Sequence, residues 1–380
     1  MSTKSSGDSG ASDDSLSEGR AVVYCEGAFG STYGKTAHGL VRRSRRYEIL
    51  SVVDSTSAGG DAGEILDQRP CGVPVLGTVE EAVEVGAATG RPATHLVVGL
   101  ATDGGRLPAH ARAGVRRALE LGLNVTSGLH DFLGEDPELA ALAERRGLRI
   151  LDIRRTPPRG QEHSFSGIIE EVSSLKLAVL GTDSAVGKRT TAWKLVDAFA
   201  AQGYRSELIG TGQTAWLQGA RYSLILDALV NDFVAGEIEH TVWRAWRETA
   251  ADVLVLEGQG SLMNPAYPGG FEILAAARPD AVILQHAPAR LEYDGFPGYR
   301  IHPLERQIRA IECVSDRPVV AVTLNHEGLG LDEIPEVCSA LSRETGLPVV
   351  DPLYGGVESL VDLLALRLAG QARIPELVRG

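Results

Sequence analysis

The chain has 380 residues, 43% of them hydrophobic, and a formal net charge of −13. This length allows two or three domains, each with its own core. The negative charge argues against a general nucleic-acid partner, because binding a phosphate backbone needs a basic face. No apolar run is long enough for a membrane helix, so we expect no membrane partner.

Residues 1–19 are mostly Ser, Gly and Asp, which predicts a disordered tail without the apolar segment of a secretory signal. We therefore expect a cytoplasmic protein. The four cysteines lie far apart and form no CxxC pair, so buried thiols are expected rather than a zinc site or a disulfide framework.

The first predicted domain, residues 20–155, begins with a βαβ unit. A strand at Ala21–Tyr24 leads into the glycine-rich segment Gly27–Thr36, and the next strand ends in Asp54. The glycine spacing is not GxGxxG, so the pattern is only weak evidence for a dinucleotide. Two alternatives stay open: Lys35 and its neighbours form an anion-binding turn for a substrate carboxylate, or the segment is only a turn.

Strands and helices keep alternating as far as residue 153, with further strands expected near 73–75, 95–98, 124–126 and 149–153. This alternation predicts a parallel, doubly wound, Rossmann-like sheet. His130 follows one of these strands, at the edge where such sheets bind ligands, although a capping or core role is the commoner one. Thr156–Gly160, with two prolines, then breaks the pattern, and residues 156–174, polar as far as Ser174, are predicted as an interdomain linker.

The second predicted domain, residues 175–380, begins with a phosphate loop. An apolar strand at Leu177–Leu180 is followed by a glycine-bounded turn and then by a helical pattern. The backbone N–H groups of such a turn and of the helix start, together with the helix dipole and a lysine, favour an anion. The residues predicted to hold it are Gly181, Thr182, Asp183, Ser184, Ala185, Val186, Gly187, Lys188, Arg189, Thr190 and Thr191.

The loop departs from the standard phosphate-loop spacing, since five residues separate Gly181 from Gly187 and Arg189 follows Lys188. It resembles the loop of dethiobiotin synthetase, a family in which the hydroxyl next to the Lys binds Mg²⁺. The nearest hydroxyl here, on Thr190, lies about 100° further round the helix. Phosphate binding is therefore better supported than Mg²⁺·nucleotide chemistry.

Polar residues follow the other expected strands of this domain. The strand at 251–256 ends in Glu257, where phosphate-loop enzymes place an acid that binds Mg²⁺ or its water. The strand at 281–285 ends in His286, and the one at 319–324 ends in Asn325, which in the dethiobiotin synthetase class helps to cradle adenine. The segment 290–306 has the composition of a lid or binding loop.

Six motifs of the chain occur together in one family, which the chain therefore resembles. These motifs are Gly27–Thr36, GTDSAVGKRTT, Gly210–Thr214, Asp232–Gly236, Glu257–Gly260 and Tyr293–Phe296. The family is a bacterial and archaeal one long catalogued as of unknown function, with a Rossmann-like N-terminal domain and a phosphate-loop C-terminal domain. Its DgcN-like members are D-glutamate N-acetyltransferases that use acetyl-CoA. The resemblance covers roughly residues 20–375.

The resemblance implies that the loop holds the phosphates of acetyl-CoA and that the acceptor is an acidic amino acid. A carboxylate or histidine would take a proton from the acceptor's amine, and Glu257 and His286 are the candidates. Arginines would hold the acceptor's carboxylates bidentately. The predicted substrate-binding residues are Lys35, Gln213, Arg290, Tyr293, Arg300 and Arg306.

A competing hypothesis is an ATP-dependent ligase or kinase built like dethiobiotin synthetase. In that enzyme Thr190, Asp227 and Glu257 would surround Mg²⁺ while ATP activates a substrate carboxylate. A third hypothesis is a non-catalytic, nucleotide-binding regulator. In each case a small homo-oligomer is expected.

Overall fold

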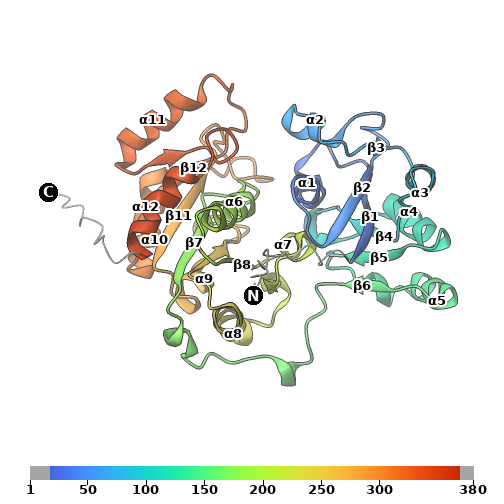
Figure 1. Ribbon diagram of the computed structural model, residues 1–380, viewed down its shortest axis with the longest axis horizontal. Coiled ribbons are helices and arrows are strands. Elements are labelled where there is room, and N and C mark those ends of the chain that lie inside the picture. Colours follow the sequence, from blue (N-terminus) through green and yellow to red (C-terminus); the bar gives the residue numbers. More distant parts are fainter. Residues whose placement is uncertain (1–17, 369–380) are drawn as a thin grey trace, which may run out of the picture. The chain divides into compact units, whose positions relative to one another are not determined.

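Two parallel α/β sheets organise the chain, as the computed structural model shows for residues 18–368 (Figure 1). One unit comprises residues up to Asp152 together with Leu217–Gly219, and the other comprises Ile153–Trp216 and the residues from Ala220 onwards. Most of the predicted tail, residues 1–17, lies outside the described residues, as do residues 369–380. Within the described part of the chain, none of the helices has the length and apolar content needed to cross a membrane.

The first unit confirms the predicted Rossmann-like fold. Its strands are β1 (Gly19–Tyr24), β2 (Tyr47–Val53), β3 (Val75–Leu76), β4 (His95–Val98), β5 (Asn124–Ser127) and β6 (Ile150–Asp152). All pair in parallel in the order β3-β2-β1-β4-β5-β6, which is the doubly wound order. Their valine-rich sequences suit strands that are buried on both faces. The helices are α1 (Lys35–Arg42), α2 (Ala62–Asp67), α3 (Val79–Ala88), α4 (Ala109–Glu120) and α5 (Pro137–Arg146).

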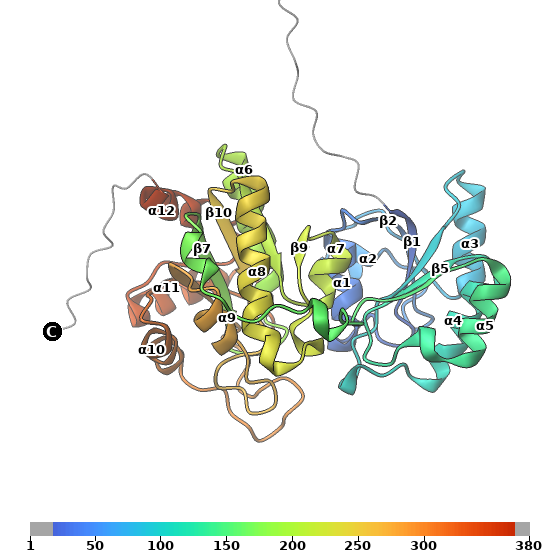
Figure 2. The ribbon, with the colours of Figure 1, turned by 90° about the horizontal axis from the view of Figure 1, so that it is seen from below.

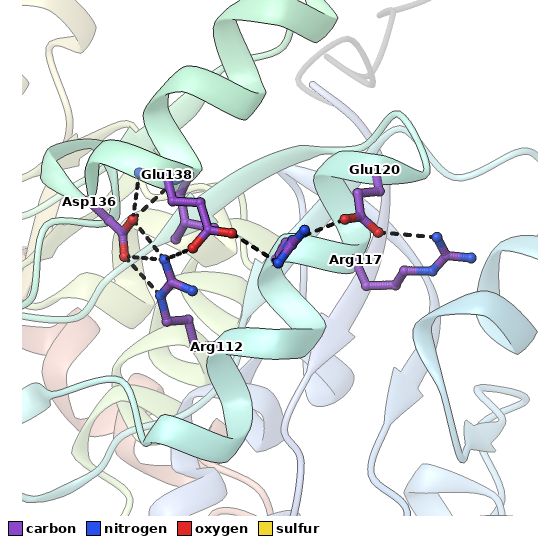
Figure 3. A network of polar contacts seen from close by, with 7 residues as sticks. Arg112, Arg117, Glu120, Asp136 and Glu138 are labelled. Atoms are coloured by element: carbon purple, nitrogen blue, oxygen red, sulfur yellow. Dashed lines mark hydrogen bonds and ion pairs between the residues drawn. The ribbon is translucent and has the colours of Figure 1, made fainter.

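An ion-pair network joins α4 to α5 (Figure 3). Asp136 caps α5 by accepting hydrogen bonds from the backbone of Glu138 and Leu139, and Arg112 of α4 binds both Asp136 and Glu138. Arg117 of the same helix binds Glu120. These pairs are largely exposed to solvent, so each contributes little to stability, and we assign the network a role in aligning the helices.

The second unit contains a seven-stranded parallel sheet. Its strands are β7 (Leu175–Gly181), β8 (Ser206–Gly210), β9 (Tyr222–Ser223), β10 (Val253–Glu257), β11 (Ala281–His286), β12 (Val319–Leu324) and β13 (Val349–Val350). The order β13-β12-β11-β7-β10-β8-β9 puts β7 between β10 and β11. The carboxyl ends of these three strands therefore lie side by side, and each leads into a predicted functional segment.

Helices cover both faces of this sheet. They are α6 (Lys188–Ala201), α7 (Gln213–Gln218), α8 (Asn231–Thr249), α9 (Phe271–Ala276), α10 (Leu304–Ser315), α11 (Ile334–Thr345) and α12 (Glu358–Leu368). Alternate residues of β7 enter two different cores, because successive side chains of a strand point to opposite faces. Leu177 and Val179 pack with residues of α6 and α12, whereas Ala178 and Leu180 pack with residues of α8, α9 and α10.

Short 3-10 helices complete the chain, namely η1 (Thr32–Gly34), η2 (Asp103–Gly105), η3 (Leu133–Glu135), η4 (Arg159–Gln161), η5 (Ile168–Glu171) and η6 (Leu226–Ala228). Two of them fall in residues 156–174, the segment predicted as a linker. This segment belongs to the second unit, where Ile169 and Val172 are buried in the core. It is thus part of a folded domain along this stretch.

Residues 163–173, here called the strap, run along α8, which Figure 2 shows beside the second sheet. The buried carboxylate of Glu239 accepts hydrogen bonds from the backbone of Ser166 and Ile169, and Glu237 accepts one from the backbone of His163. Gly236 permits this close approach, since a Cβ there would lie 2.0 Å from the carbonyl oxygen of His163. The glycine of the segment Asp232–Gly236 therefore has a packing role.

The prediction that all the thiols are buried is wrong for two cysteines. Cys25 is buried at the end of β1, but Cys71 and Cys313 are exposed and Cys338 is half-buried. Cys71 lies in the turn after α2, and Cys313 lies outside the buried stripe of α10. An isolated cysteine in a turn or a helix carries no sequence signal for the side it faces.

Candidate functional site

The predicted phosphate loop connects β7 to α6. Gly187 precedes the first residue of α6 with a φ of 102°, in the region that favours glycine. Gly181 ends β7, where an added Cβ would lie 2.9 Å from side-chain carbons of both Val186 and Lys188. The two glycines therefore let the chain turn tightly beneath the lysine side chain.

Lys188 folds back over this loop. Its Nζ donates hydrogen bonds to the carbonyl oxygens of Asp183, at 2.7 Å, and Gly260, at 2.8 Å. These two hydrogen bonds hold the ammonium group at the helix start, beside the loop's backbone, and the side chain is buried. A lysine, a glycine-bounded turn and a helix N-terminus are the parts of a phosphate-binding site.

Asp183 fixes the shape of the loop. Its carboxylate is fully buried and accepts four hydrogen bonds: Oδ1 accepts from Ser184 N and Asn264 Nδ2, and Oδ2 accepts from Arg290 Nη1 and Asp294 N, at 2.6 to 2.9 Å. Three of these donors come from segments far along the chain. The loop is therefore held by tertiary contacts as well as by its own sequence.

Arg290 supports the loop from the other side. Its Nη1 also donates to the carbonyl oxygen of Ser184, at 2.8 Å, and its Nη2 donates to Glu327, at 2.6 Å. Both terminal nitrogens of Arg290 therefore bind groups within the protein. The Arg290 side chain is only 10% exposed. A contact between Arg290 and a substrate carboxylate stays a prediction, and it would require these bonds to be exchanged.

The hydroxyl of Thr191 is turned into the sheet. It donates to Oε1 of Gln285, which also accepts a hydrogen bond from Thr323 at 2.6 Å. The carbonyl oxygen of Gln285 accepts from Thr182 N, which extends the pairing of β7 and β11 into the loop. Thr190 is half-buried and is the remaining hydroxyl of the first helical turn.

Glu257 ends β10, beside the loop. It is 4% exposed, its Oε1 lies 3.6 Å from Arg189 Nη1, and its Oε2 accepts a 3.3 Å hydrogen bond from Thr211 N. Burial raises the pKa of Glu257, although the positive charges of Arg189 and Lys188 act against this rise. The guanidinium of Arg189 therefore lies against the acid predicted to bind Mg²⁺.

The other predicted metal ligands have different surroundings. Asp227 lies in η6 with an exposed side chain that forms an ion pair with the buried Arg154. Across residues 18–368, no group of three or more His, Cys, Asp or Glu side chains has a geometry that could hold a metal ion. The predicted set of Thr190, Asp227 and Glu257 thus stays a prediction.

His286 ends β11, on the opposite side of β7 from Glu257. Its Nδ1 lies 3.0 Å from the hydroxyl oxygen of Thr182. Burial lowers the pKa of His286 to about 4, so the imidazole is neutral at pH 7. Two inter-strand spacings, about 10 Å, separate the strands that end in Glu257 and His286. A ligand at the loop would therefore lie between these two groups.

Asn325 follows β12 and donates its backbone N–H to the carbonyl oxygen of His286, at 2.8 Å. Its Oδ1 accepts a hydrogen bond from the backbone of Glu327, at 3.0 Å. Asn325 therefore lies at the same sheet edge as the loop, and a contact with adenine stays a prediction.

The segment 290–306 forms a short hairpin followed by the start of α10. An antiparallel bridge joins Glu292 to Arg300, and Tyr293 is buried with its hydroxyl donating to the carbonyl oxygen of Met263 at 2.9 Å. Arg300 and Arg306 are exposed. Their guanidinium groups are thus accessible to solvent, unlike that of Arg290.

Two other predicted substrate residues belong to separate elements. Gln213 is the first residue of α7 in the second unit and is half-buried. Lys35 is the exposed first residue of α1 in the first unit. Their roles in binding a substrate remain predictions.

The glycine-rich turn of the first unit is closed by its own carboxylate. The backbone N–H groups of Gly27 and Phe29 both donate to Asp54, which is fully buried, at 2.9 and 3.1 Å. The N–H of Ala37 at the start of α1 donates to the carbonyl oxygen of Gly99. These donors are those that an anion at this turn would need, so the geometry favours the plain turn.

Two contributors to the site were missed at the sequence level. Gln285 is a polar residue in the apolar strand Ala281–Gln285, and that break in the pattern could have marked it as a buried hydrogen-bonding group. Asn264 lies in an irregular segment rich in Pro and Gly, which gives no periodic signal. Its contact with Asp183 becomes evident only in the fold.

The sequence matches two family descriptions. Residues 163–361 match "Domain of unknown function (DUF1611_C) P-loop domain", and residues 55–156 match "Domain of unknown function (DUF1611_N) Rossmann-like domain". Two curated relatives are named D-glutamate N-acetyltransferase. The protein from Tritonibacter scottomollicae is 33% identical over 302 residues, which is 76% of this chain and 84% of that protein. The protein from a Pseudoalteromonas species is 32% identical over 291 residues, 74% of this chain and 82% of that protein.

A solved structure supports the fold along nearly the whole chain. It is the crystal structure of a DUF1611 family protein from Anabaena variabilis, with 31% identity and a TM-score of 0.82. The match covers 92% of this chain and 99% of that one.

Proposed function

The chain belongs to the DUF1611 family, and from this premise we propose that it transfers the acetyl group of acetyl-CoA to the amine of an acidic amino acid, D-glutamate first among them. The phosphate loop carries the proposal on the structural side. Lys188 and the start of α6 form a site for the phosphates of CoA. The names of the two curated relatives support the reaction and the acceptor.

The reaction needs a group that removes a proton from the acceptor's ammonium form. The amine nitrogen then attacks the thioester carbonyl and the C–N bond forms. The nitrogen gives up a second proton, the C–S bond breaks, and the leaving thiolate takes up that proton. A base works best when its pKa is near the working pH. Burial moves the pKa of Glu257 upward towards that range and moves the pKa of His286 downward, away from it.

We therefore assign the general base to Glu257. His286 is neutral at pH 7 and can hydrogen-bond to the substrate at the opposite side of the loop. The exposed Arg300 and Arg306 are the candidates for the acceptor's carboxylates, because a guanidinium fork matches a carboxylate bidentately.

The test measures two products in parallel reactions. Purified protein is incubated with acetyl-CoA and D-glutamate, with acetyl-CoA and L-glutamate, and with Mg²⁺·ATP and each acid. Free thiol is followed with a disulfide reagent and ADP with a coupled assay. The proposal expects thiol release that depends on the acid, without ADP, and a loss of about 100-fold or more in kcat for Glu257→Gln.

Other outcomes would contradict the proposal. Formation of ADP without thiol would indicate an ATP-dependent ligase or kinase instead. Tight binding of a nucleotide with neither product would indicate a regulator. Thiol release that is unchanged in Glu257→Gln would exclude that residue as the base while leaving the reaction in place.

A further inference from the structure

Phosphate-loop proteins usually hold Mg²⁺ with the hydroxyl that follows the loop lysine and with an acid on a neighbouring strand. The structure tests whether the residues of this chain fit that ion. The position after Lys188 is Arg189, and the hydroxyl of Thr191 is bonded to Gln285 inside the sheet. Asp227 is paired with Arg154. The remaining hydroxyl, on Thr190, lies about 100° further round the helix than the position after the lysine, so these donors do not match a magnesium site.

Arg189 lies against Glu257, the acid predicted to bind the ion. Its Nη1 is 3.6 Å from Oε1 of Glu257, the acid at the tip of the neighbouring strand, and its side chain is 21% exposed. Arg189 is the second residue of α6, so it shares the helix start with Lys188. Apart from the Asp183–Arg290 pair inside the loop, the charge at the helix start therefore comprises two cations and one carboxylate, plus the positive end of the helix dipole.

We infer that Arg189 replaces the divalent cation at this loop, so that the loop binds phosphate esters without Mg²⁺. The fixed positive charge of a guanidinium and its several N–H donors can neutralise and bond a phosphate directly. Glu257 positions that group through the ion pair. The ligand class is then a phosphate ester that is bound free of metal, such as the phosphorylated adenosine diphosphate part of CoA, and not a Mg²⁺·nucleoside triphosphate. The inference rests on the proposed binding of phosphate at this loop.

Calorimetry with CoA and with ADP, each in excess EDTA and in excess Mg²⁺, tests the inference. For the unaltered protein we expect Kd values for CoA that agree within about twofold between the two conditions. Arg189→Thr, which restores a hydroxyl after the lysine, should weaken CoA binding in EDTA by about 10-fold or more, the cost of one charge-assisted hydrogen bond. Arg189→Lys, which keeps the charge, should lose less and stay independent of Mg²⁺.

Arg205→Thr is the matched control. Arg205 pairs with Asp252 before β8 and β10, at the end of the sheet opposite the loop, and its side chain is 61% exposed. The Kd values of the Arg205→Thr variant for CoA should equal those of the unaltered protein in both conditions. Tryptophan fluorescence confirms that each variant is folded.

Three results would overturn the inference: CoA binding that needs Mg²⁺ in the unaltered protein, equal affinities of Arg189→Thr and the unaltered protein in EDTA, or no binding of either ligand. The proposed function fails separately, when CoA binds in EDTA but no thiol is released with any acid. Conversely, acid-dependent thiol release that requires Mg²⁺ would support the acetyl transfer and refute the role of Arg189.

Discussion

Asp183→Asn removes the carboxylate that holds the phosphate loop. An asparagine at this site keeps one acceptor oxygen, which can still accept from Ser184 N and Asn264. Its amide nitrogen would then face Arg290 Nη1 and Asp294 N, two donors with no acceptor between them. Breaking a buried ion pair costs about 3–5 kcal/mol. We expect the lower value, about 3 kcal/mol, because Glu327 still pairs with Arg290.

The four tryptophans report the second unit alone, since Trp193, Trp216, Trp243 and Trp246 all lie in it. Unfolding in guanidinium chloride, followed by tryptophan fluorescence, therefore measures the stability of the unit that contains Asp183. At roughly 2–4 °C for each kcal/mol, the melting temperature should also fall by on the order of 10 °C.

Asp252→Asn is the control for this prediction, because it makes the same chemical change in a solvent-exposed pair with Arg205 and should lower the free energy of unfolding far less. Asp183→Asn should in addition weaken CoA binding, since the loop loses its fixed shape. If Asp183→Asn lowered the free energy of unfolding no more than Asp252→Asn does, the assignment of Asp183 as the anchor of the loop would be refuted.

Three further predictions concern binding, folding and pH. Lys188→Ala should abolish measurable CoA binding in calorimetry together with activity, whereas Lys194→Ala on the same helix should leave both unchanged. Gly236→Ala should destabilise the second unit by about 2 kcal/mol or more in fluorescence-detected unfolding, because its Cβ collides with the strap backbone; a neutral effect would contradict the docked strap. Burial lowers the pKa of His286 to about 4 from 6.5, so the unfolded chain binds the proton more readily. The free energy of unfolding should therefore fall between about pH 6.5 and 4, and in His286→Asn this total fall should be smaller by about 3 kcal/mol. The same fall in both proteins would exclude the effect.

The local elements of the fold could be predicted from the sequence because their signals are local. Buried strands of the parallel sheets are continuous apolar runs such as Leu177–Leu180, and each ends at a glycine or a polar residue. Alternation with helices then fixes parallel pairing, so Glu257, His286 and the loop had to emerge at one sheet edge. The positions of these residues in the sheet follow from topology alone.

The contacts between distant segments could not be predicted in this way. Asp183 meets donors at Asn264, Arg290 and Asp294, and no periodicity relates such separations. The role of residues 156–174 could not be predicted for the same reason, because their two adjacent prolines and polar composition favour a linker. The carboxylate of Glu239 fixes part of that segment on α8 from more than 60 positions away. A partner that lies far along the chain changes the role of a segment without changing its composition.

The two glycine-rich turns of the chain each hold a buried carboxylate, Asp54 in the first unit and Asp183 in the second, and they differ in the cations at the helix start. In the first unit Asp54 supplies a negative charge from within: burial raises its pKa, but hydrogen bonds from Thr56, Gly27 and Ser57 outweigh burial and lower it, so the group is ionised at neutral pH. An external anion would be repelled by this carboxylate and would have to displace it from the backbone N–H groups. In the second unit Lys188 and Arg189 add two positive charges at the helix start, beside the loop that contains Asp183. These charges favour anion binding at the second turn over the first, although the N-terminal fold is the one associated with dinucleotides.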